Sequence, residues 1–170
     1  WQVPAPPGPP LDPVGFHLGN GLLHTLNGLL VWSVLSEIFR PRRREGAGAG
    51  IPFLASGGPL IGAALFLVHP VQVESVASVW GRKDLLSGFF ALLALASYLK
   101  AGRAARGGGL LSGLALGSYF AALLTREGAA ALLPVVAIIE IFRSREDGVA
   151  KAARRAARFL VPAAVITALF

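Results

Sequence analysis

The feature that most constrains this chain is a succession of long uncharged apolar runs separated by short basic segments. Residues 18–36 are nineteen consecutive positions without a charge, and residues 51–68 are eighteen more. A helix of roughly twenty apolar residues spans the hydrocarbon of a bilayer. The chain is only 15% charged, whereas a soluble domain is roughly 25% charged. These observations predict an integral membrane protein.

Six apolar runs predict an all-α, polytopic transmembrane helix bundle with about five to six spans. They cover residues 16–38, 51–68, 85–99, 107–125, 128–139 and 159 onward. The third run has only fifteen residues, so we expect it to extend by a turn or to tilt little, and we expect Pro134 to break the fifth. Residues 1–15 are predicted to be a Pro-rich outer loop or tail. Residues 16–170 are predicted to be part of a multi-pass domain that is truncated at both ends.

The distribution of positive charge predicts the orientation of the spans. The segments after the first, third and fifth runs hold thirteen of the sixteen Lys and Arg residues. Cytoplasmic loops carry such an excess, so residues 1–15, 69–84 and 126–127 are expected on the non-cytoplasmic side. The net charge of +7 is explained by this topology, and no nucleic-acid partner is predicted. The expected location is a bacterial inner membrane, or the ER membrane in a eukaryote.

A polar stripe runs along the first predicted span. Its members, at helical spacing, are His17, Asn20, His24 and Asn27. At 100° per residue they lie within an arc of about 80°. Polar groups are costly against lipid, so this stripe should face protein or a wet cavity. Two interpretations stay open: hydrogen bonds between helices, or the wall of a cavity near a substrate.

Residues 69–84, with the sequence HPVQVESVASVWGRKD, connect the second and third runs. The residue before proline leaves the α region, so the second span should end at His69. A short interfacial helix is predicted over residues 70–80, with Trp80 as an aromatic anchor and Gly81 as its end. Asp84 is a candidate N-cap of the third span.

The charged residues of this connection form a candidate binding site. The guanidinium of Arg82 matches phosphate oxygens, and Lys83 adds a point charge. Glu74 would orient a basic residue or bind a sugar hydroxyl, and His69 would donate to phosphate or relay a proton. The predicted phosphate- and sugar-binding set is His69, Glu74, Arg82, Lys83, Asp84, Arg126 and Glu127. Purely structural roles, such as contacts with lipid head groups, remain open. No metal site and no cofactor are predicted.

Three stretches resemble one family of membrane enzymes. The sequence HPVQVESVASVWGRKDLLSGFFALLALASYL resembles the transmembrane-and-tetratricopeptide-repeat O-mannosyltransferases and their bacterial relatives. The run FHLGNGLLHTLNGLLVWSVL is similar to the preceding helix of that family. LLTREGAAALLPVVAII is similar to a family segment with Ser-Lys-Glu, for which this chain has Thr125, Arg126 and Glu127. The resemblance covers residues 16–142.

The resemblance implies a glycosyltransferase of the GT-C fold. Such an enzyme moves a sugar, here a mannose-like hexose, from a polyprenyl- or dolichyl-phosphate donor to a protein or glycan acceptor on the non-cytoplasmic face. The family's catalytic acid lies in the first outer loop, so we expect it upstream of Trp1, and no catalytic residue is assigned within this chain. The alternative is a membrane transporter or a protein that binds a lipid-linked substrate without transfer chemistry.

Overall fold

The computed structural model describes residues 13–40, 57–78, 80–104 and 107–170, with residues 13, 146 and 147 described by backbone alone. Every regular element in these ranges is a helix, which confirms the all-α prediction. The elements are α1 (Pro13–Phe39), α3 (Gly58–Val68), α4 (Gln72–Ala77), α5 (Arg82–Ala101), α6 (Gly108–Thr125), the 3-10 helix η1 (Glu127–Ala131), α7 (Leu132–Asp147) and α8 (Val149–Leu169). Most of the predicted Pro-rich tail lies outside the described residues.

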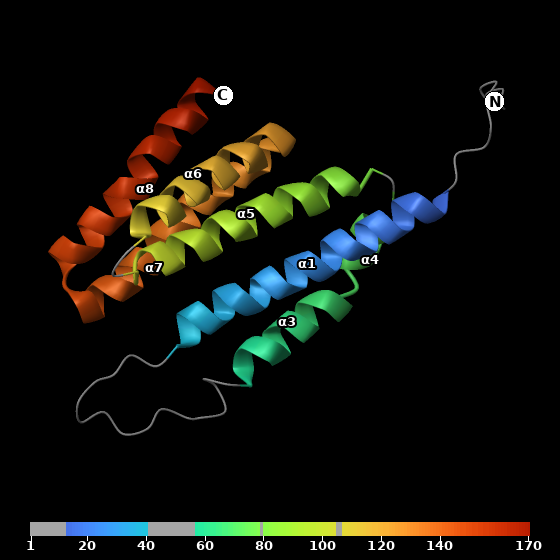
Figure 1. Cartoon of the computed structure of the whole chain (residues 1–170), viewed down its shortest axis with the longest axis horizontal. Helices are drawn as coiled ribbons and strands as arrows, with labels where there is room; N and C mark the ends of the chain where they lie inside the picture. Colours follow the sequence, from blue (N-terminus) through green and yellow to red (C-terminus); the bar gives the residue numbers. More distant parts are fainter. Residues whose placement is uncertain (1–12, 41–56, 79, 105–106) are drawn as a thin grey trace.

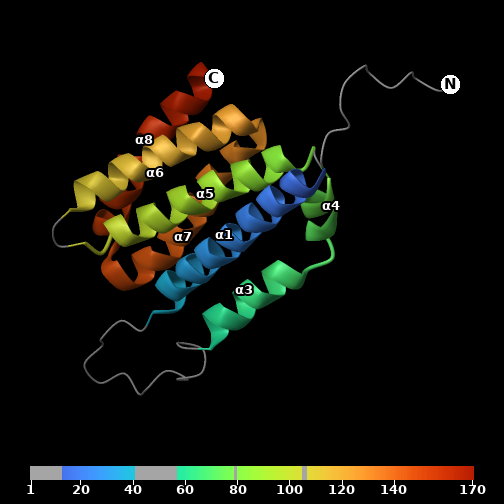
Figure 2. The ribbon, with the colours of Figure 1, turned by 45° about the vertical axis from the view of Figure 1, so that its right-hand side comes forward.

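The long helices pack side by side as a bundle (Figure 1). α1 and α5 start at the same end, and α3 returns along α1 on the side away from α5 (Figures 1 and 2). α6, α7 and α8 cover the other side of α5. We call the end formed by residues 69–84, the start of α1 and residues 126–127 the motif end. The opposite end, formed by the last turns of α1, α5 and α7 and the first turns of α8, is the basic end.

Small residues let the central helices approach closely. Ala94 of α5 and Ala115 and Ala122 of α6 have no exposed surface, so the two backbones pack against each other without intervening long side chains. Tyr119 and Val136 are also fully buried. The core therefore sits between α5, α6, α7 and α8, and it fixes the direction of α5, whose first turn belongs to the motif end.

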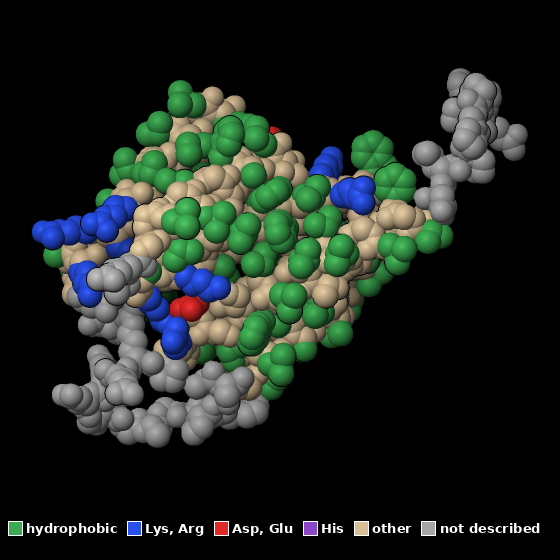
Figure 3. Space-filling view, in the orientation of Figure 1, with side chains coloured by type: hydrophobic (Ala, Val, Ile, Leu, Met, Phe, Trp, Pro, Cys, Tyr) green, Lys and Arg blue, Asp and Glu red, His purple; other side chains and the backbone are tan. Residues whose placement is uncertain are grey.

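The outer surface of the bundle is apolar over its middle, and Lys and Arg gather at one end (Figure 3). Leu18 is 70% exposed and Leu110 is 82% exposed, as expected for side chains that face lipid. Among the described residues, three helices are long and apolar enough to cross a membrane: Val14–Phe39, Arg82–Ala101 and Gly108–Thr125. α3 is a shorter apolar helix of eleven residues, and the first part of its predicted span, residues 51–56, lies outside the described residues.

The fifth run is divided between η1 and α7, and the sixth is part of the longer helix α8. α7 continues through the basic segment to Asp147, and α8 starts two residues later, so most of the segment that we predicted as a basic loop is helical. The prediction that Pro134 breaks the fifth run is wrong. Pro134 is the third residue of α7, where the backbone N–H has no partner within the helix and proline costs nothing.

The ends of α3, α4 and α5 differ in detail from the prediction. His69 ends α3 in an extended conformation, as predicted. The interfacial helix is shorter than residues 70–80, because Ser78 is already extended. Gly81 therefore does not end α4; it is the N-cap residue of α5. Asp84 is not the N-cap but lies in the first turn of α5, where its charge still complements the helix dipole.

Candidate functional site

The polar stripe of α1 holds the backbone of the motif end in place. Asn20 donates from Nδ2 to the carbonyl oxygens of Val76, at 3.2 Å, and Ser78, at 3.0 Å. Asn27 donates from Nδ2 to the carbonyl of Leu85 at 3.0 Å. Both asparagines are buried. The bonds from Asn20 satisfy carbonyls at the end of α4 that have no partner within that helix, and the bond from Asn27 adds a second donor to a carbonyl of α5.

His24 fixes the end of α3 in the same way. Its Nε2 lies 3.0 Å from the carbonyl oxygen of Leu67. A carbonyl only accepts, so Nε2 carries the proton and Nδ1 presents a lone pair. Nδ1 is buried and has no hydrogen-bond partner in the described part of the chain. The ring also packs against Phe66, with 5.4 Å between centroids. His24 thus offers one free acceptor to a ligand.

All three histidines of the chain line one cavity of about 380 Å³ between α1, α3 and α4. His17 and His69 are exposed at its rim, and His24 lies deeper. Nδ1 of His69 accepts a hydrogen bond from the backbone N–H of Val71 at 3.2 Å. Most of the remaining lining is apolar, contributed by α3 and α4. In the described residues no group of His, Asp and Glu is arranged to hold a metal ion.

Arg82 packs against the start of α1. Its guanidinium lies over the ring of Phe16, 5.3 Å from the centroid. The same guanidinium occupies the space that a side chain at position 19 would need, which only Gly19 leaves open. Arg82 is half-buried. The cation–π contact and the glycine together hold the guanidinium in one place, without a carboxylate partner among the described residues.

Lys83 and Asp84 point to other neighbours. The ammonium of Lys83 lies 5.8 Å from the ring centroid of Trp80, and the side chain is exposed. Asp84 forms an ion pair with Arg126, which joins the first turn of α5 to the end of α6. Both side chains of this pair are partly exposed. The pair neutralises the charge of Arg126 and leaves Arg82 and Lys83 as the cations without an ion-pair partner in the described part of this end.

The two remaining acids of the predicted set, Glu74 and Glu127, lie on separate elements. Glu74 is exposed in the first turn of α4, and Glu127 is exposed at the start of η1. Neither has an ion pair with any described residue. The structure therefore places all seven predicted residues at the motif end. It brings Asp84 and Arg126 together, sets Arg82 and Lys83 on one turn, and leaves the two glutamates on separate elements.

A second cavity, of about 470 Å³, opens at the same end between α3, α4, α5, η1 and α7. Its lining is mainly apolar, from residues such as Leu92, Leu95 and Leu132. Four polar side chains also line it: Asn27, Gln72, Ser75 and Asp84. An apolar channel with a few polar groups suits an amphiphilic ligand with a hydrocarbon part.

Sequence reasoning missed Gly19, Gln72 and Ser75, and it assigned Gly81 to the end of the interfacial helix rather than to the contact between α4 and α5. A methyl group at Gly81 would meet the backbone of Ser75, so only glycine lets α4 approach the start of α5. Gln72 and Ser75 line the larger cavity, but they are uncharged, so a search for charged residues does not find them. The sequence signal that could have identified the two glycines is their position next to polar residues of the site, since Gly19 precedes Asn20 and Gly81 precedes Arg82.

Comparison with known proteins identifies relatives. Human "Protein O-mannosyl-transferase TMTC4" is 44% identical over 91 residues, which is 54% of this chain and 12% of that protein. The Drosophila melanogaster protein Tmtc2 of the same description is 35% identical over 144 residues, 82% of this chain and 14% of the relative. The Xenopus laevis protein tmtc2 is 32% identical over 136 residues. No family model and no solved structure matches significantly.

Proposed function

Because the chain is a homologue of the TMTC protein O-mannosyl-transferases, we propose that it forms part of a membrane glycosyltransferase. The chain spans about an eighth of the length of these relatives, so their activity is carried over here as a proposal. The single observation that supports it most is the similarity itself, 32–44% identity to proteins named for mannosyl transfer. The helical bundle with its apolar surface is the kind of scaffold that such an enzyme needs.

The donor in this proposal is a sugar linked to a polyprenyl or dolichyl phosphate. Arg82 and Lys83 support it, because they are adjacent cations in the first turn of a long helix and neither has an ion-pair partner in the described chain. A phosphate there would accept charge-assisted hydrogen bonds and also gain from the helix dipole. Arg82 is already held by Phe16 and Gly19, so little side-chain entropy is lost on binding.

The larger cavity of the motif end, which reaches the first turn of α5 at Asp84, is proposed to receive the hydrocarbon of the donor. Its apolar lining of leucines supports this, and Asp84 and Gln72 line the same cavity. The sugar would then lie toward α4, where Glu74 is free to accept from a hydroxyl. His69 and His24 face the neighbouring cavity and offer ring nitrogens for the acceptor or for a proton relay.

The motif end is proposed to face the non-cytoplasmic side of the membrane. The support is the charge distribution: the described cations lie mostly just after α1, at and just after the end of α5, near the end of α7 and on the first turns of α8, at the opposite end. Cytoplasmic faces carry such an excess of Lys and Arg. An acceptor would therefore be a protein or glycan that has crossed the membrane or is crossing it.

The experiment is a transfer assay with the intact protein in proteoliposomes. A labelled sugar on a polyprenyl or dolichyl phosphate is supplied together with a peptide acceptor, and the labelled peptide is measured. We expect transfer that Glu74→Gln and Arg82→Ala reduce strongly, by about 10- to 100-fold for Arg82→Ala, while Arg145→Ala, an exposed position at the basic end, retains it. Movement of the donor across the bilayer with no labelled peptide would overturn the proposal in favour of transport.

A further inference from the structure

A third cavity, of about 360 Å³, lies at the basic end, opposite the proposed donor site. Four cationic side chains of α8 line it: Lys151, Arg154, Arg155 and Arg158. They are spaced i, i+3, i+4 and i+7, so they share one face of the helix. None of the described side chains that line the cavity is acidic. Like charges on one helix face repel one another, which favours an anion between them.

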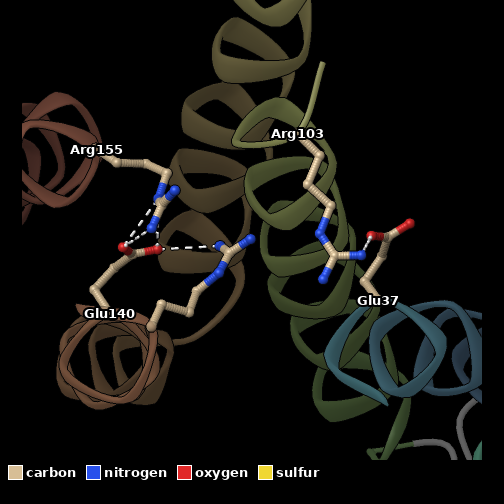
Figure 4. Close-up of polar contacts among 5 residues, drawn as sticks. Glu37, Arg103, Glu140 and Arg155 are labelled. Atoms are coloured by element: carbon tan, nitrogen blue, oxygen red, sulfur yellow. Dashed lines mark hydrogen bonds and ion pairs between the residues drawn. The ribbon is translucent and has the colours of Figure 1, made fainter. Parts of the chain in front are cut away.

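The acids that the structure describes at this end are already paired. Glu140 is buried in α7 and accepts from Arg155 with both carboxylate oxygens, at 2.9–3.1 Å, and from Arg143 at 3.1 Å (Figure 4). Glu37 of α1 accepts from Arg103 at 2.9 Å (Figure 4). Each of these carboxylates faces more than one arginine, because Arg40 also lies near Glu37.

Three of the four lining cations have no such partner. Lys151, Arg154 and Arg158 form no ion pair with any described residue, and all three side chains are exposed. Arg155 is different, since its ion pair with Glu140 holds it in the wall. The cavity thus contains one guanidinium that is held by an ion pair, that of Arg155, and three exposed cationic groups that can bind a ligand.

The floor of the cavity is rigid and carries a polar group. Phe159 of α8 is buried against Tyr98, with 5.0 Å between ring centroids, and against Tyr119 at 6.0 Å. The hydroxyl of Tyr98, which lines the cavity, is buried and has no hydrogen-bond partner among the described residues. This hydroxyl is a second feature of the cavity that an anion would satisfy.

Apolar surface adjoins the cavity mouth. Val161 of α8 is 60% exposed three residues after the lining residue Arg158, and Val165 is 54% exposed seven residues after it, so both share the helix face of the cavity's cations. A ligand at this place therefore meets cations on one side and lipid-facing side chains on the other. That combination matches a phospholipid, whose phosphate sits at the boundary between water and hydrocarbon.

We propose that this cavity binds the phosphate of an anionic phospholipid from the leaflet at the basic end. The guanidinium groups of Arg154 and Arg158 accommodate phosphate oxygens, and Lys151 adds charge. The acyl chains lie along the exposed apolar side chains of α8. The site is separate from the proposed donor site and does not depend on sugar transfer.

The test measures lipid binding to the intact protein in a neutral detergent by native mass spectrometry. Phosphatidic acid, phosphatidylcholine and inorganic phosphate are supplied in separate arms. The cavity variant is Arg154→Gln with Arg158→Gln, and the matched control is Arg40→Gln with Arg145→Gln, which removes the same charge from exposed positions outside the cavity. Lys151→Gln serves as an independent second variant if the double variant does not fold.

We expect phosphatidic acid to bind the cavity variant at least about tenfold more weakly than the wild type, and the control as tightly as the wild type. Phosphatidylcholine should bind weakly to all forms. Equal losses in the two double variants would overturn the proposal, because they would show a general effect of charge. Tight binding of inorganic phosphate alone would overturn the assignment to a lipid.

Discussion

Asn20 donates a hydrogen bond from Nδ2 to the carbonyl oxygen of Ser78, 58 residues further along the chain. The same nitrogen donates to Val76, so one side chain closes the C-terminal end of α4. The chain enters α5 directly after this point. The positions of Arg82 and Lys83 therefore depend on a buried amide of α1 that never needs to contact a substrate.

Removing this amide should loosen the motif end. Asn20→Ala leaves two carbonyls without their donor, and Asn20→Asp replaces the donor with an acceptor. We expect each to lower the free energy of unfolding by about 1–2 kcal/mol, measured by denaturant titration in detergent. Thr25→Ala is the control, because Thr25 is exposed and bonds only to Gly21 of its own helix. Equal stability of the Asn20 variants and the control would contradict the role of Asn20.

The approach of α4 to α5 should tolerate no side chain at position 81. Gly81→Ala would place a methyl group against the backbone of Ser75, and we expect faster proteolysis between α4 and α5. Gly117→Ala in α6 is the control, since nothing lies within 4 Å of the added methyl group. That control should be neutral or slightly stabilising because alanine favours helix. A Gly81→Ala protein as resistant as the wild type would show that the contact is not tight.

The ion pair between Asp84 and Arg126 should contribute little to stability. Both side chains are more than a third exposed, so a double-mutant cycle with Asp84→Asn and Arg126→Gln should give a coupling energy below about 1 kcal/mol. The pair is expected instead to set the charge of the motif end, so that reversing both residues retains more transfer activity than reversing one. A coupling energy well above this value would show a pair shielded from water.

The ion pair at the other end should behave in the opposite way. Arg155 and Glu140 are nearly buried, and Arg155→Ala leaves the carboxylate with Arg143 as its only bonded cation among the described residues. We expect a loss of about 3–5 kcal/mol in the free energy of unfolding. Arg145→Ala, an exposed position on the same helix as Glu140, is the control and should change little. Similar stability of the two variants would mean that Glu140 is not effectively buried.

Local patterns in the sequence predicted most of the helices. The end of α3 before Pro70, the extension of the third run by a turn and the range of α6 follow from proline geometry, length and charge. The end of α4 did not follow, because it depends on Asn20, a donor from a distant helix. For the same reason the sequence predicted an end of the fifth run at residue 139, just before Glu140. In the structure Glu140 lies inside α7 and pairs with Arg155 of the next helix.

The candidate site was predictable as a location but not as an arrangement. Charge count and spacing assigned all seven residues to one end, and the structure has them there. Which cation pairs with which acid is a tertiary property, so the bond between Asp84 and Arg126 and the contact of Arg82 with Phe16 required the structure. The spaces left by Gly19 and Gly81 are likewise invisible until the neighbouring backbone is placed.

The central claim is that Arg82 at the motif end holds the phosphate of a lipid-linked sugar donor. The most direct test is kcat/KM for the lipid donor, measured with the intact protein, Arg82→Ala, Arg82→Lys and the control Arg145→Ala. We predict a decrease of about 10- to 100-fold for Arg82→Ala, a smaller decrease for Arg82→Lys, and no change for the control. A folded Arg82→Ala protein with the kcat/KM of the wild type would contradict the claim.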